Sequence, residues 1–339
     1  MSHRETELPA RPPTAAGASR AAAARSGGVR EAAPREGSPQ PEDEARVRRV
    51  CDRIECLPTL PEVVTRILQL VDDPKIPGNQ VADVVSCDQA TSAAVLKLVN
   101  APFYGLRRRI SSIHQAVTLL GFRAVRNLAL SAVLVRNFGE PSRDRRFDRA
   151  ALWKHAVACG IGSRSLARRL AQEDAEEAFL AGLVHDMGLV ILDQYFHEEF
   201  QRVLDLVLDA KTPQVEAERE VVGTDHAQIG GWLSRRWNFP ASVTEAVTCH
   251  HEPWKARRAE TLAAIVHVAN ACGPGSGPEA EAEGEPTHTP SPGSLSWERD
   301  PIDPRAMERL GLQPNDIVAF RLALLEEWDG AQDLVRLLA

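Results

Sequence analysis

Apolar residues recur at intervals of three and four positions through most of residues 46–272 of this 339-residue chain. That interval places them on one face of an α-helix, as with Val64, Ile67 and Leu68. No segment shows the strict alternation of apolar and polar residues that marks a half-buried strand. We therefore predict an all-α fold, built from a succession of helices.

Residues with capping chemistry divide this pattern into separate helices. Thr59 and Glu62 have the spacing of a capping box, in which each side chain satisfies a backbone N–H of the first turn, and Ser112 with Gln115 repeats it. Gly121 is placed to end the helix that Ser112 begins, because glycine tolerates the left-handed backbone found there. Asp88 is placed to cap a helix and Gly311 to end one, and either Thr224 or Asp225 is placed to cap the helix that starts near His226.

Two segments lack the large apolar side chains that a core needs. Residues 1–45 are rich in Ala, Arg, Gly, Pro and Glu, and we expect a disordered tail. Residues 273–302 have a similar composition and are expected to form a flexible linker or loop. Residues 303–339 return to helical spacing, and we expect C-terminal helices that pack on the preceding domain. Their apolar stripe consists of Ile317, Phe320, Leu324, Leu325 and Trp328.

Composition narrows the class of protein. Hydrophobic residues make up 43% of the chain, enough for a sizeable core. The net charge of −7 disfavours a protein that binds nucleic acid over its whole surface. No uncharged apolar run reaches the length of a membrane span, and no apolar signal segment begins the chain. The six cysteines are scattered without a C-x-x-C pair, so we expect reduced thiols and a cytoplasmic protein.

The adjacent pair His185-Asp186 interrupts the apolar run from Ala178 to Leu192. A charge inside such a run is costly to bury unless it is paired or bound to a cation. A structural explanation exists as well, since the carboxylate would be satisfied by a neighbouring histidine or by the helix that follows.

Further histidines occur at one per helical segment around this pair: His155 before it, and His226 and His250 after it. Imidazoles together with a carboxylate suit Mn, Fe or Zn, and ligands spread over several helices are typical of sites inside helical bundles. Histidine also accepts a buried hydrogen-bonding role readily. On the residues alone, a site for a divalent transition metal and a set of structural histidines are both open.

The order H…HD…H…HH resembles the HD metal-dependent phosphohydrolase superfamily. Three segments of the first half resemble a degenerate branch of it, the HDOD (HD-related output) domain: LPTLPEVV at 57–64, DQATSAAVLKLVNA at 88–101 and SIHQAVTLLG at 112–121. The resemblance covers roughly residues 50–270. It implies a two-lobed helical domain over 46–272, with an N-terminal helical bundle at 46–148 and an HD-like bundle at 149–272.

The resemblance implies bacterial signal transduction through an output or scaffold module that generally lacks hydrolase activity. It also implies a metal set of His155, His185, Asp186, His226 and His250. Two departures weaken that set: Asn270 stands where the superfamily has an aspartate, and Leu189 stands where cyclic-di-GMP phosphodiesterases of the HD-GYP group have a lysine. The missing aspartate and lysine charges disfavour hydrolysis of a phosphodiester, because that reaction needs a metal-generated hydroxide and a stabilised leaving group. His251 and His267 are interpreted as supporting or core residues.

Two functions follow as alternatives. The first is a non-catalytic module that acts through a signalling protein partner, with no membrane contact. The second is a metal-dependent phosphohydrolase for a nucleotide or cyclic dinucleotide. Nucleic-acid binding is disfavoured, because the helix-turn-helix-like segment 115–134 offers few basic side chains. The C-terminal stripe leaves a homodimer open as a further arrangement.

Overall fold

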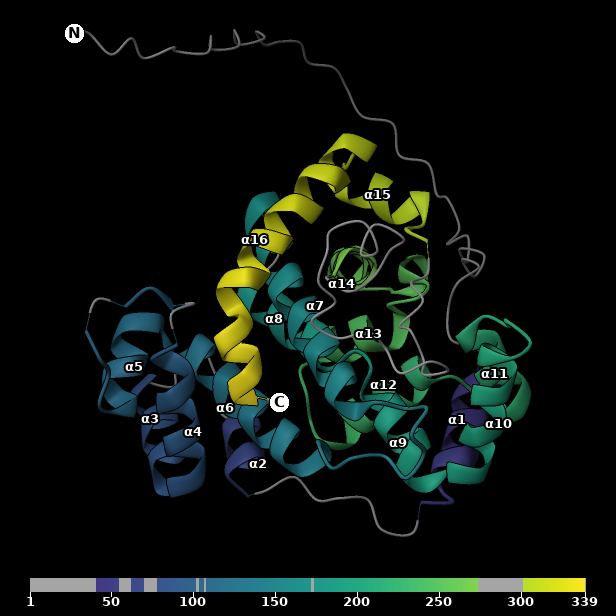
Figure 1. Cartoon of the computed structure of the whole chain (residues 1–339), viewed down its shortest axis with the longest axis horizontal. Helices are drawn as coiled ribbons and strands as arrows, with labels where there is room; N and C mark the ends of the chain where they lie inside the picture. Colours follow the sequence, from purple (N-terminus) through teal and green to yellow (C-terminus); the bar gives the residue numbers. More distant parts are fainter. Residues whose placement is uncertain are drawn as a thin grey trace, which may run out of the picture. The chain divides into compact units, whose positions relative to one another are not determined.

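The computed structural model describes residues 41–54, 62–69, 78–101, 104–106, 108–171, 174–273 and 301–338. Within those ranges every regular element is a helix and no strand occurs, which confirms the all-α prediction (Figure 1). None of the helices in the described part of the chain has the length and apolarity that crossing a bilayer requires.

The first part of the chain forms helices that pack mainly through aliphatic side chains. They are α1 (Pro41–Cys51), α2 (Glu62–Gln69), α3 (Gly78–Cys87), α4 (Gln89–Val99), α5 (Ile113–Leu120) and α6 (Phe122–Phe138). Helix α4 packs against α6, and α3 against α5. Helix α1 begins at Pro41, so the last residues of the predicted disordered tail are helical instead. Proline suits this first position because a helix leaves that N–H without an internal partner.

Several predicted helix ends are confirmed by their hydrogen bonds. The Asp88 carboxylate accepts a bond from the backbone N–H of Thr91, and the Ser112 hydroxyl accepts one from that of Gln115. Gly121 ends α5 with φ +84°, a backbone angle that favours glycine. The Ser112 capping box is only half formed, because the Gln115 side chain accepts from the N–H of Ser111 instead. Thr59, the other predicted capping residue, lies outside the described residues.

The second part of the chain supplies the residues of the predicted site. Its helices are α7 (Arg149–Leu170), α8 (Ala175–Val184), α9 (Met187–Tyr195), α10 (His197–Leu208), α11 (Gln214–Val221), α12 (His226–Arg236), α13 (Ala241–Cys249), the short 3₁₀-helix η2 (Pro253–Lys255) and α14 (Glu260–Cys272). Helix α7 lies along α8, and α12 packs against both α9 and α13. These contacts bring the ends of several helices together beside α7.

Two helices close the chain: α15 (Pro304–Leu310) and α16 (Pro314–Leu338). Gly311 ends α15 with φ +67°, as predicted. Helix α15 packs on α14, and α16 packs on α7 and α14 and also on α4 and α6 (Figure 1). Ile317, Phe320 and Leu324 are buried by these contacts, whereas Leu325 remains 46% exposed, so the predicted stripe is wrong at that position. The helix turns Leu325 away from the face that Phe320 presents to the core.

Candidate metal centre

Helix ends carry most of the predicted ligands. His185 directly follows α8 and Asp186 directly precedes α9, so the pair lies in the break between the two helices. His226 is the first residue of α12, where the Asp225 side chain caps the helix, and His250 directly follows α13. His155 projects from the middle of α7. The polar side chains thus reach the interior where backbone turns interrupt the apolar helices.

Glycines allow these helix ends to approach closely. A Cβ atom at Gly182 in α8 would lie 2.7 Å from the carbonyl oxygen of Cys159 in α7. At Gly188 in α9 it would lie 2.7 Å from the carbonyl carbon of His226. Such contacts are far inside van der Waals distance, so any larger side chain would push α8 from α7 or α9 from α12. The glycines therefore set the separation across which Asp186 meets the imidazoles.

Asp186 presents one carboxylate oxygen to each of two sets of imidazoles. Its Oδ2 lies 3.0 Å from Nε2 of His185 and 3.6 Å from Nε2 of His155. Its Oδ1 lies 3.3 Å from Nε2 of His226 and 3.6 Å from Nε2 of His250. The structure thus brings all five predicted ligands into one cluster, with Asp186 between its two halves.

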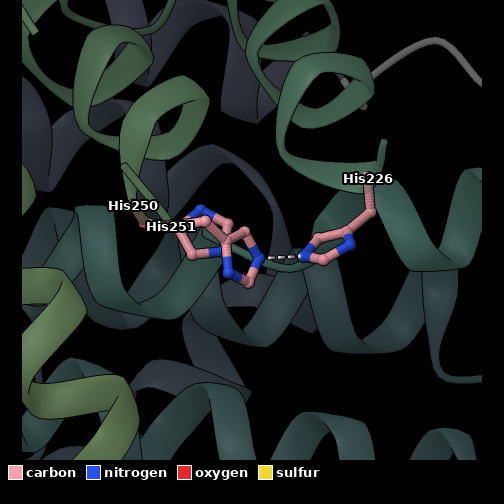
Figure 2. Close-up of side chains that lie close together, drawn as sticks. All are labelled: His226, His250 and His251. Carbon is pink, nitrogen blue, oxygen red and sulfur yellow. Dashed lines mark hydrogen bonds between the residues drawn. The ribbon is translucent and has the colours of Figure 1, made fainter. Parts of the chain in front are cut away.

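His251 belongs to the same cluster. Its Nε2 lies 2.9 Å from Nε2 of His226, and the rings of His226, His250 and His251 converge, as Figure 2 shows. The ligand atoms of these three residues all lie within 4.8 Å of one another, as do those of the set His155, His185 and Asp186. Sequence reasoning placed His251 among the supporting residues. The His-His doublet itself was the signal that could have included it. We call these six residues the His/Asp centre.

Backbone carbonyls orient two of the imidazoles toward the interior of the centre. Nδ1 of His185 donates to the carbonyl oxygen of Gly182 at 2.7 Å, and Nδ1 of His250 donates to that of Val247 at 2.8 Å. A neutral imidazole that donates from Nδ1 carries a lone pair on Nε2. Both Nε2 atoms are buried and have no aligned hydrogen-bond partner within the described part of the chain. Nε2 of His185 lies 3.0 Å from Oδ2 of Asp186, but the two atoms are not aligned for a hydrogen bond.

Glu218 supports the centre from α11 and was missed by sequence reasoning. Its side chain is fully buried, and its Oε2 accepts bonds from both the backbone N–H and Nδ1 of His226, at 2.7 and 2.8 Å. Gln214 donates to its other oxygen at 2.9 Å. A carboxylate on the far nitrogen of a histidine fixes the ring and raises its basicity as a ligand. No sequence motif links Glu218 to His226, so only the packing of α11 reveals it.

Charges within the centre perturb one another strongly. Burial alone would lower the pKa of His185 and of His226, but Asp186 and Glu218 beside them raise both values well above the ordinary range. Burial opposes ionisation of Asp186, yet the neighbouring imidazoles hold its pKa well below its usual value. Burial and the adjacent His251 lower the pKa of His250 well below its usual value. The protein therefore balances one carboxylate against several competing imidazoles.

The donor set fits a divalent transition metal. The buried Nε2 atoms of His185 and His250 lack aligned partners among the described residues and are donors that Zn, Mn and Fe accept, and the Asp186 carboxylate would supply negative charge. Asn270, which stands in place of the expected aspartate, lies half-buried in α14. Among the described residues no hydrogen bond or ion pair joins it to the His/Asp centre. Leu189 is buried in the first turn of α9 and adds no charge.

Comparison with known proteins is consistent with this architecture. Residues 57–253 match the family model of the HDOD domain, more than half of the chain. The chain belongs to the HDOD family. In this HDOD protein the matched region begins after α1, covers α2 to α13 and ends just past the His250-His251 doublet.

Individual relatives of this HDOD protein are distant. An uncharacterized protein from Treponema pallidum (strain Nichols) is 26% identical over 223 residues, which are 65% of this chain but only 43% of that protein. A structure named as a phosphohydrolase, from Shewanella amazonensis SB2B, is 22% identical with a TM-score of 0.65 and covers 87% of this chain and 98% of its own. One named for signal transduction, from Marinobacter aquaeolei VT8, is 23% identical with a TM-score of 0.67 and covers 88% and 65%. At these identities the structural likeness concerns the fold.

Proposed function

We propose that this protein is a bacterial signal-transduction output module that acts through protein contacts. In this proposal the His/Asp centre holds a divalent transition metal that stabilises the domain or responds to a ligand, without turning over a substrate. The name of the Marinobacter protein, which refers to signal transduction, favours this class. The single observation that carries the non-catalytic role is the enclosure of the centre.

The enclosure is close to complete for the predicted ligands. His185 and His250 have no exposed surface, and even His155 and Asp186 expose only 9% and 7%. A phosphodiester must reach the metal and still leave room for an attacking water and a departing oxygen. His251, half-buried at the edge of the cluster, is the most open member. A centre with this burial and one carboxylate among five imidazoles suits a bound ion better than a reacting substrate.

The second candidate is a metal-dependent phosphohydrolase for a nucleotide or cyclic dinucleotide. The observation that favours it is the two-sided placement of Asp186, whose oxygens face separate imidazole sets. That arrangement would let one carboxylate contact two ions, as in centres that clamp a phosphoryl group. The name of the Shewanella protein is consistent with this activity. In this function Asp186, His155 and His185 would hold one ion, and the remaining imidazoles the other.

A metal and activity measurement separates the candidates. The protein is purified without chelators, its transition-metal content is quantified, and a generic phosphodiester is assayed with added Mn²⁺ or Fe²⁺. We expect metal binding without turnover. Metal-dependent turnover that disappears in Asp186→Ala, with circular dichroism of the variant unchanged, would establish the hydrolase instead.

Asn270→Asp tests whether Asn270 stands at a ligand position of the metal from which a carboxylate is missing. If Asn270 occupies the ligand position, the new charge should tighten metal binding and increase metal occupancy at equal concentration. An unchanged affinity would show that α14 holds this position away from the His/Asp centre, as the contacts of the described residues indicate. In that case the centre consists of the six residues alone.

A further inference from the structure

Helix α16 carries an apolar stripe that the rest of the described chain leaves uncovered. Val318, Leu322 and Leu325 are 58%, 60% and 46% exposed, and they follow one another at spacings of four and three residues. The opposite side of the helix, including Phe320 and Leu324, is buried against the domain. Helix α16 therefore has two apolar faces, and packing within the described part of the chain covers only one of them.

The exposed face has the pattern of a coiled-coil seam. Spacings of four and three place Val318 at d, Leu322 at a and Leu325 at the next d position of a heptad. Asn315 then falls at the preceding a position, where a buried asparagine specifies a parallel two-stranded coiled coil. Asp329 falls at the following a position and ends the seam, because two facing carboxylates repel each other.

The flanking charges select the partner and its direction. Arg321 lies at g and Glu326 at the following e position, and both are exposed. In a parallel pair of identical helices, each g residue faces the e residue five positions further along the partner. Arg321 of one copy would therefore face Glu326 of the other, twice by symmetry. In an antiparallel pair, g would face g and e would face e, which sets like charges against each other.

We propose that α16 pairs in parallel with α16 of a second copy of this chain, through Val318, Leu322 and Leu325. The seam from Asn315 to Leu325 is about 15 Å long at the rise of an α-helix. Such a short contact buries less than a standard protein interface, so the dimer is weak and forms at micromolar concentrations. This proposal does not depend on metal binding at the His/Asp centre.

Sedimentation of the full chain over a concentration series tests the association. We expect a monomer–dimer equilibrium whose dissociation constant rises at least about 100-fold in Leu322→Glu, since two buried leucines are replaced by facing charges. Leu119→Glu is the matched control, because Leu119 in α5 is equally exposed at 59% and lies outside α16. That variant should associate like the wild type.

Charge exchange provides a test that does not rely on disrupting the apolar seam. Arg321→Glu and Glu326→Arg should each weaken the dimer, and the double variant should restore it because the g–e pairs are formed again with reversed sign. Restoration would support the proposal even if Leu322→Glu failed to fold. Equal weakening in the double variant would overturn it.

Cysteine cross-linking determines the direction. In a parallel pair, Val318→Cys and Leu325→Cys each lie opposite their own copy and should form disulfide-linked dimers separately. In an antiparallel pair these positions lie about 10 Å from their own copies along the axis, so only a mixture of the two variants would cross-link. Both variants are made with Cys87→Ser, which removes an exposed native cysteine, and that background protein should not cross-link.

Three results would overturn the proposal. They are a monomer at every accessible concentration, a dimer that tolerates Leu322→Glu, and cross-linking only in the mixture.

Discussion

Asp186 and Asp193 are buried aspartates at the two ends of α9, and they are satisfied to different degrees. Asp193 accepts bonds from Nε and Nη2 of Arg149 at 2.7 and 2.6 Å, while its other oxygen accepts from the Ser142 hydroxyl at 2.7 Å. Asp186 is surrounded by imidazoles between 3.0 and 3.6 Å away. Two of these imidazoles, His185 and His250, leave buried nitrogens without a partner among the described residues.

The difference in hydrogen bonding distinguishes a structural ion pair, at Asp193, from a candidate binding site, at Asp186. Two nitrogens of the Arg149 guanidinium contact Oδ2 of Asp193 and the Ser142 hydroxyl bonds Oδ1, so the charge of Asp193 is compensated within the chain. At Asp186 the same chain supplies several imidazoles, two of which keep a buried nitrogen without an aligned partner among the described residues. A buried group that the chain leaves unsatisfied is therefore the better indicator of ligand binding.

The largest effect is expected at the satisfied aspartate. Asp193→Ala should lower the free energy of unfolding by about 3–5 kcal/mol, because it leaves the Arg149 charge buried without compensation. Urea denaturation measures this change. Ser142→Ala removes a neutral donor to Asp193 and an acceptor for the backbone N–H of Asp144, and should cost about 1–2 kcal/mol. Equal losses in the two variants would mean that the Arg149–Asp193 pair is no more important than a single hydrogen bond.

Added metal should act on the other aspartate. With Mn²⁺, Fe²⁺ or Zn²⁺ at about 100 times the dissociation constant, the wild type should gain about 2.7 kcal/mol of stability, because the ion binds only the folded state. Asp186→Ala should gain nothing, whereas Asp193→Ala should retain the gain. Thermal unfolding with and without metal measures both. An undiminished gain in Asp186→Ala would show that the Asp186 carboxylate is not a ligand of the bound metal.

Glu218 should contribute through His226. Glu218→Gln keeps the size of the side chain but removes the charge that orients Nδ1, and we expect a 10- to 100-fold loss of metal affinity, about 1.4–2.7 kcal/mol. Glu245→Gln is the control, since the carboxylate of Glu245 accepts from backbone N–H groups near η2 and contacts no imidazole. Calorimetric titration of the two variants should therefore give different affinities. Equal affinities would remove Glu218 from the support of the centre.

The last prediction concerns protons, and its size depends on the pH interval that is compared. In the metal-free protein the raised pKa values of His185 and His226 favour the protonated form of both imidazoles. A metal ion must displace these protons, so its affinity should increase with pH, by up to about tenfold per pH unit for each proton released. Folding depends on these protons as well. In the metal-free protein, the ion pairs of His185 with Asp186 and of His226 with Glu218 add stability at low pH. That stability is lost as pH rises through the raised pKa values of the two histidines. Calorimetry in buffers of different ionisation enthalpy counts the protons.

Local features of the fold were predictable because their causes are local. Asp88, Ser112 and Asp225 cap helices through N–H groups two or three residues away, and Gly121 and Gly311 end helices through their own backbone angles. The apolar spacing likewise indicated helices. Leu325 shows where this reasoning fails, since a stripe predicts one apolar face but not which of its members the neighbouring helices cover.

The sequence by itself determined the helical class, the caps and the residue types of the centre. It left open which nitrogen faces which oxygen, because Asp186 meets His155 and His250 across separations of 31 and 64 residues. Only the tertiary structure decided that His251 and Glu218 belong beside His226, and that Asn270 does not contact the cluster. The physical reason is that caps depend on one turn of backbone, whereas the centre depends on how closely glycine-lined helices pack.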